Sequence, residues 1–67
     1  MRERIGQQVA ELRARRGMTL RQLAEKSGVS SQNITKIEHG RYNVSIDILD
    51  KVASALGAQL EIEERGE

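Results

Sequence analysis

Seven basic side chains gather within residues 13–41, a density suited to binding an anion. Only Glu25 and Glu38 oppose them in that stretch. The basic residues are Arg13, Arg15, Arg16, Arg21, Lys26, Lys36 and Arg41. Residues 42–67 instead hold two basic and six acidic residues, so the net charge of the whole chain is only +1. We therefore expect the middle of the chain to face an anionic partner and the acidic C-terminal part to face elsewhere.

The composition excludes several other kinds of chemistry. The 67 residues include no cysteine and a single histidine, His39, which excludes disulfides, thiolate metal sites and His-rich metal clusters. There is no glycine-rich phosphate loop and too little chain to enclose a water-excluding pocket, so we predict neither an enzyme nor a cofactor. No apolar run approaches the roughly 18 residues of a membrane span, and the N-terminus lacks a signal peptide. We expect a cytoplasmic protein without a membrane partner.

Glycines divide the chain into short helical units. Gly17, Gly28, Gly40 and Gly57 each follow a stretch of apolar residues at helical spacing, as C-terminal helix stops do. The absence of proline also favours helices. The predicted helices cover about residues 3–16, 20–26, 30–38 and 46–56. The residues expected to face a small aliphatic core are Ile5, Val9, Leu12, Leu20, Leu23, Ala24, Val29, Ile34, Ile37, Ile46, Leu49, Val52, Ala53 and Leu56.

Two of these helices are joined by a very short connection. Thr19, with Gln22 three residues later, forms a capping-box pattern before the helix over 20–26, and Ser30 is the expected N-cap of the helix over 30–38. Only Ser27, Gly28 and Val29 lie between the two helices. Helices joined so tightly must cross steeply, which is the geometry that lets the second one lie in the major groove of DNA.

The same residues resemble the XRE family, the phage-repressor and Cro type of helix-turn-helix proteins. The matching stretches are TLRQLAEKSGVSSQNITKIEHG from Thr19 to Gly40 and SIDILDKVASALG from Ser45 to Gly57. The resemblance covers roughly residues 3–57. It implies a compact, repressor-like all-α fold of four to five helices, with a DNA-binding domain over residues 1–57 and a recognition helix that begins at Ser30.

The resemblance also implies roles for individual side chains. The outward residues that would read bases are Ser31, Gln32, Thr35 and Lys36. Gln32 can make a bidentate pair with adenine and Lys36 can donate to guanine, each worth about 1–3 kcal/mol of discrimination when aligned. Backbone amides at the start of the helix over 20–26 would meet phosphate. The side chains expected to contact phosphate are Thr19, Arg21, Asn33, His39, Arg41 and Asn43.

Three features bear on how closely the chain follows the family pattern. Arg13 and Glu38 lie where the family often places an ion pair between its first and third helices. The first residue of the second helix is commonly a phosphate-binding glutamine, whereas here it is Leu20, which we expect in the core. In place of a fifth helix, residues 58–64 alternate as a half-buried strand does, an ending that resembles HipB-type antitoxins.

A strand without a partner suggests a second copy of the chain. Seven extended residues span about 23 Å, and their backbone groups need a partner strand that this chain does not contain. Two copies related by a two-fold axis could form an antiparallel ribbon, with Leu60 and Ile62 at the dimer interface and residues 65–67 as a tail. The dimer would place two recognition helices about 34 Å apart, one turn of DNA.

Plainer interpretations exist for several of these residues. The basic residues could form a solvated face, and the polar residues 30–33 could be ordinary caps and surface residues. His39 could interact with the end of its own helix rather than with phosphate. Tyr42 could pack over the junction between the helices over 30–38 and 46–56, or touch DNA. Leu60 and Ile62 could belong to a disordered acidic tail.

Two functions fit these expectations. The first is a sequence-specific transcriptional regulator, a homodimeric repressor that occupies a palindromic operator in double-stranded DNA. The alternative is an antitoxin that neutralises a toxin protein and regulates its own operon, because the acidic C-terminal part could meet a basic partner. The predicted domain leaves no residues for sensing a ligand, so no small-molecule effector is expected.

Overall fold

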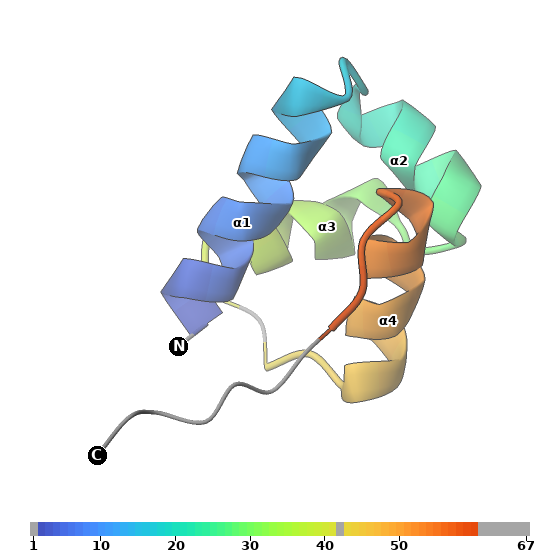
Figure 1. The fold of residues 1–67 in the computed structure, drawn as a ribbon. Helices are drawn as coiled ribbons and strands as arrows, with labels where there is room; N and C mark the ends of the chain where they lie inside the picture. The colour runs from blue at the N-terminus through green and yellow to red at the C-terminus, as the bar shows by residue number, and fades with distance from the viewer. Residues whose placement is uncertain (1, 42, 61–67) are drawn as a thin grey trace.

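The fold is all-α, as predicted. The computed structural model describes residues 2–41 and 43–60. In those ranges the chain forms four helices: α1 (Arg2–Arg15), α2 (Leu20–Ser27), α3 (Ser31–Glu38) and α4 (Ile46–Ala55). Helix α1 packs on α3, and α2 packs on both α3 and α4 (Figure 1). None of these helices is long and apolar enough to cross a membrane.

The N-caps predicted for α2 and α3 are confirmed. Thr19 and Gln22 form a reciprocal capping box, in which the backbone N–H of Gln22 donates to Thr19 Oγ1 at 3.0 Å and that of Thr19 donates to Gln22 Oε1 at 2.8 Å. Ser30 caps α3, and Ser45 caps α4. Each cap satisfies an amide at a helix start that has no carbonyl within its own helix.

The tight turn between α2 and α3 depends on Gly28. This residue ends α2 with a φ of +77°, a left-handed conformation that glycine adopts at no steric cost. Its N–H donates to Ala24 O at 2.9 Å, and the N–H of Val29 donates to Ser27 Oγ at 3.1 Å. The turn therefore satisfies its own backbone groups while reversing the chain into α3.

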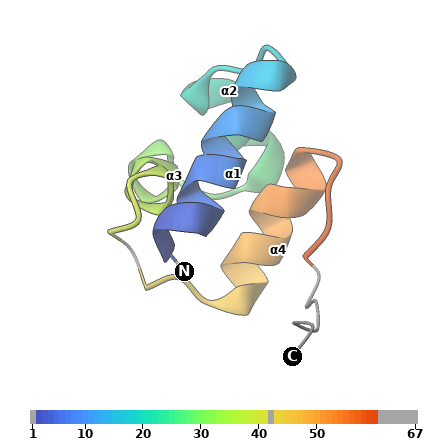
Figure 2. The ribbon, with the colours of Figure 1, turned by 60° about the vertical axis from the view of Figure 1, so that its left-hand side comes forward.

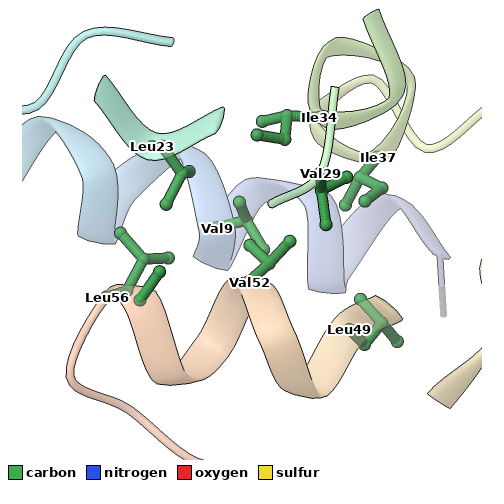
Figure 3. Packing of buried hydrophobic residues seen from close by; sticks show 9 residues of the cluster. Val9, Leu23, Val29, Ile34, Ile37, Leu49, Val52 and Leu56 are labelled. Atoms are coloured by element: carbon green, nitrogen blue, oxygen red, sulfur yellow. The ribbon is translucent and has the colours of Figure 1, made fainter. Parts of the chain in front are cut away.

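The core is aliphatic and small. Figure 3 shows Val9 of α1 and Val52 of α4 turned toward each other, with Leu23 and Leu56 on one side of them. Nine hydrophobic residues are buried in the described chain: Val9, Leu23, Val29, Ile34, Ile37, Leu49, Val52, Ala55 and Leu56. The other predicted core residues pack against this cluster while partly exposed, namely Ile5, Leu12, Leu20 and Ala24, or are half-buried, as Ala53 is. Ala55 is a buried residue that the spacing did not identify.

Ile46 was wrongly predicted to face the core. Its residue surface is 75% exposed. At about 100° per residue, Ile46 lies at the edge of the apolar face formed by Leu49 and Val52, and it occupies the first position of the helix. Ile48, which we did not predict, packs against the core from the same turn. The first turn of α4 therefore presents an isoleucine to solvent.

The predicted strand over 58–64 is absent from the part that the structure describes. Residues 58–60 form no strand, because the C-terminal turn of α4 continues into them: the N–H of Ala58 donates to Ala53 O at 2.8 Å. The segment then runs back alongside α4 (Figures 1 and 2) and ends at Leu60, which is 42% exposed. Ile62, the remainder of the predicted strand, the tail over 65–67 and Tyr42 lie outside the described residues.

Gly6 allows α1 to lie directly against the end of α3. A Cβ atom built at Gly6 would meet the carbonyl oxygen of Ile37 and would lie 2.8 Å from that of Glu38. Both atoms belong to the backbone, so neither can move aside as a flexible side chain would. The close approach of the two helices therefore requires a residue without a Cβ.

Gly6→Ala is expected to destabilise the protein by about 1–3 kcal/mol, the usual cost of overpacking, despite the better helix propensity of alanine. Chemical denaturation of the two proteins measures this. Gln8→Ala, an exposed position on the same helix, serves as the control and should change stability by less than about 0.5 kcal/mol. Equal stability of Gly6→Ala and the wild type would show that α1 and α3 are not in backbone contact.

Candidate nucleic-acid interface

Helix α3 presents two contrasting sides. Ile34 and Ile37 point into the core and are 0% and 3% exposed. Ser31, Gln32 and Lys36 are exposed and Thr35 is half-buried. At helical spacing Gln32, Thr35 and Lys36 lie away from the two isoleucines, and Ser31 lies at the edge of this side, next to Ile34. The structure thus brings the four predicted base-reading residues together on one side of one helix.

An ion pair joins the C-terminal end of α3 to α1. Arg13 Nε donates to Glu38 Oε2 at 2.7 Å and Arg13 Nη2 donates to Glu38 Oε1 at 3.1 Å, while Nη1 donates to Met18 O at 3.1 Å. The two side chains are only 23% and 10% exposed. The hydrogen bond with Glu38 raises the pKa of Arg13 above its ordinary value. The ion pair implied by the family resemblance is therefore present, as a two-pronged contact that fixes direction as well as distance.

The start of α2 offers backbone amides to an anion. The Thr19 hydroxyl oxygen already accepts the N–H of Gln22, so Thr19 acts first as a cap. The next two amides, of Leu20 and Arg21, occupy the first helical positions, where no carbonyl of the same helix is available. Such amides and the positive end of the helix dipole favour a phosphate oxygen. Leu20 itself packs against the core, as expected for a residue that departs from the family pattern.

Arg21 carries a carboxylate neighbour that the sequence reading did not consider. Its Nε lies 3.7 Å from Glu25 Oε2, one helical turn later, and the side chains are 87% and 69% exposed. Among the described residues, the other acidic side chain within 13–41 is Glu38, which is held by Arg13. The spacing of four residues between Arg21 and Glu25 was a signal in the sequence that could have revealed the pair. A phosphate that binds Arg21 must compete with Glu25.

The remaining predicted phosphate contacts lie at the two ends of α3. Asn33 follows the Ser30 cap and is half-buried. His39 Nδ1 lies 2.8 Å from Thr35 O, and the N–H of Arg41 donates to Lys36 O at 3.0 Å, so both residues follow directly from the end of the helix. His39, Arg41 and Asn43 are exposed. The contacts of these residues with phosphate stay predictions.

Comparison with known proteins identifies this arrangement. The sequence model of the helix-turn-helix family matches residues 9–62. The immunity repressor protein of Bacillus phage phi105 is 43% identical over 56 residues, which make up 84% of this chain and 39% of that protein. This chain thus spans about two fifths of the length of the phage repressor.

Two solved structures have the same fold. The clp gene regulator ClgR from Corynebacterium glutamicum superposes with a TM-score of 0.81 at 45% identity, covering 87% of this chain and 62% of that one. The restriction-modification controller protein C.AhdI from Aeromonas hydrophila superposes with a TM-score of 0.83 at 33% identity, covering 87% and 88%. These names describe a repressor, a regulator and a controller, and they lend no support to the antitoxin alternative.

If Glu25 competes with phosphate for Arg21, removing the charge of Glu25 should increase the affinity of the protein for DNA. Glu25→Gln should raise the affinity for random duplex DNA about two- to fivefold, the range expected for releasing an exposed ion pair. In an Arg21→Ala background the same change should have a smaller effect, and Arg21→Ala alone should reduce the salt slope of binding by about one. Fluorescence anisotropy at several stated salt concentrations measures all three.

Glu11→Gln, which removes an exposed carboxylate from α1, is the control for a general charge effect. An equal gain from Glu25→Gln with and without Arg21 would argue against direct competition.

Proposed function

This chain belongs to the helix-turn-helix family of DNA-binding transcriptional regulators, and from that premise we propose that it acts as a homodimeric repressor that reads a palindromic operator through α3. The observation that carries the proposal is the two-sided character of α3. Its apolar side is fully committed to the core, and its polar side holds all four predicted base-reading residues.

The dimensions of α3 suit the major groove. An α-helix with its side chains is about 10–12 Å in diameter, and the major groove of B-form DNA is about 12 Å wide. The eight residues of α3 make it about 12 Å long. Gln32 and Lys36 lie one turn apart on the exposed side. Gln32 is proposed to pair with adenine and Lys36 to donate to guanine, while Ser31 and Thr35 lie beside them.

Phosphate contacts would orient α3 in the groove. The amides of Leu20 and Arg21 begin α2, and Arg41 and Asn43 follow the end of α3, so the predicted contacts come both before and after the recognition helix in the chain. Contacts of this kind fix the register of a protein on the duplex without reading sequence themselves. These phosphate contacts would supply the part of the affinity for DNA that decreases as the salt concentration rises.

A single copy would read too little DNA to be selective. A helix about 12 Å long spans roughly four base pairs, whereas a genome offers about a million or more competing sites. A second copy doubles the site and makes it palindromic. Ile46 and Leu60, at 75% and 42% exposure, are the exposed large hydrophobic residues of the described chain. We propose that both residues contribute to the dimer contact, Ile46 at the start of α4 and Leu60 after its end, with Leu60 as the part of the predicted interface that lies within the described residues.

The proposed reading of adenine predicts the behaviour of one variant. Operator selection from random duplex DNA should return a palindrome whose half-sites lie about one turn apart. Gln32→Ala should then lose about 1–3 kcal/mol of discrimination at one base position in each half-site and keep its affinity for random DNA. Binding measurements on duplexes substituted at each position, at one stated salt concentration, provide the test.

Two results would count against this account. An equal loss of affinity on random and selected DNA would show that Gln32 only positions the protein. Failure of the wild type to select any sequence would remove sequence-specific recognition from the proposal.

The proposed dimer contact predicts that a charge at Ile46 separates the copies. Ile46→Asp should give a monomer by light scattering and weaker operator binding, while the fold remains intact because an acidic residue is favourable in the first turn of a helix. Ser54→Asp, on an exposed position of the same helix, should remain dimeric. A wild-type protein that is monomeric on its operator, or an Ile46→Asp variant that stays dimeric, would contradict the proposed contact.

A further inference from the structure

Thr35 differs from the other predicted base-reading residues in what its side chain can offer. Its hydroxyl Oγ1 donates to the carbonyl oxygen of Ser31, four residues earlier, at 2.9 Å. In the described chain the side chains of Gln32 and Lys36 are exposed and make no such bond to their own helix. The polar atom of Thr35 is therefore engaged within α3, and the polar atoms of its neighbours are free to meet a base.

The internal bond determines which group of Thr35 remains for contact with a base. A hydroxyl has one proton, so a hydroxyl that donates to Ser31 O cannot also donate to a base. Threonine and serine in helices commonly make this bond to the preceding turn. The three substituents of Cβ are staggered, so the methyl is turned away from the carbonyl that the hydroxyl approaches. Thr35 is half-buried, and because its hydroxyl is bonded within α3, the methyl is the group of its side chain that remains for contact with a base.

We propose that Thr35 determines specificity by placing its methyl group against the C5-methyl of a thymine. Thymine is the only one of the four bases that carries a methyl group in the major groove, so an apolar contact there distinguishes it from the other three. The inference rests on the proposed function of α3. It names a third base, thymine, and the methyl group by which it would be recognised, beside the hydrogen bonds proposed for Gln32 and Lys36.

The test removes one methyl group at a time from each partner. After operator selection, each thymine is replaced in turn by deoxyuridine, which lacks only the C5-methyl. At one thymine in each half-site the replacement should weaken binding of the wild type about fourfold, the effect of losing one buried methyl-sized contact. The other thymines should respond less.

Two variants of Thr35 separate its methyl from its hydroxyl. Thr35→Val keeps the methyl and the branched shape, so its fold loss of affinity on the deoxyuridine operator should match that of the wild type. Thr35→Ser keeps the hydroxyl and loses the methyl, so it should bind the thymine operator about fourfold more weakly and show no further loss on the deoxyuridine operator. Circular dichroism of each variant checks that α3 is retained.

Three outcomes would overturn the inference, and they can be told apart. If Thr35→Val loses the preference and Thr35→Ser retains it, the hydroxyl reads the base. If a palindrome is selected but no thymine responds in a way that depends on Thr35, the proposed operator binding stands and the methyl contact is wrong. If no sequence is selected at all, the proposed function fails and this inference fails with it.

Discussion

The close contact between α1 and the end of α3 is the constraint on which the rest of the structure depends. It has two parts that act differently. Gly6 removes the Cβ that would otherwise hold the helices apart at the Ile37 carbonyl. Arg13 donates two hydrogen bonds to the carboxylate of Glu38 and a third to Met18 O. Gly6 determines how closely α1 and α3 approach, and the ion pair between Arg13 and Glu38 determines their relative orientation.

This contact matters because the hydrophobic core alone is small and without strong directionality. Aliphatic side chains of similar shape can slide past one another at modest cost, whereas a two-pronged guanidinium-carboxylate contact cannot. The turn at Gly28 fixes the opposite end of α3. With both ends held, the outward side of α3 is presented as a rigid surface, which lowers the cost of ordering it on a ligand.

Much of this fold could be predicted from the sequence because its signals are local. Caps such as Thr19 and Ser30 and the stop at Gly28 depend on neighbours within four residues, and all three are confirmed. The prediction for Ile46 was wrong because periodicity cannot tell the edge of an apolar face from its centre. The predicted strand is absent over residues 58–60, where the N–H of Ala58 donates to Ala53 O at the end of α4.

Three other features have no local signal in the sequence, because they depend on contacts in space or on a rotamer. The need for glycine at position 6 arises from the carbonyl of a helix about thirty residues away, and nothing near Gly6 in the sequence signals it. The hydroxyl bond of Thr35 depends on a rotamer, which residue type alone does not specify. The Arg13 and Glu38 pair was expected only through the family resemblance, since twenty-five residues separate the partners.

Amide chemical shifts of the labelled protein, recorded while its selected operator duplex is added, test the central claim most directly. The account predicts that the largest changes fall on the amides of Leu20 and Arg21 and along Ser31 to Lys36. Buried positions such as Val52 should change little. Changes concentrated on α4, with α3 unaffected, would contradict the account.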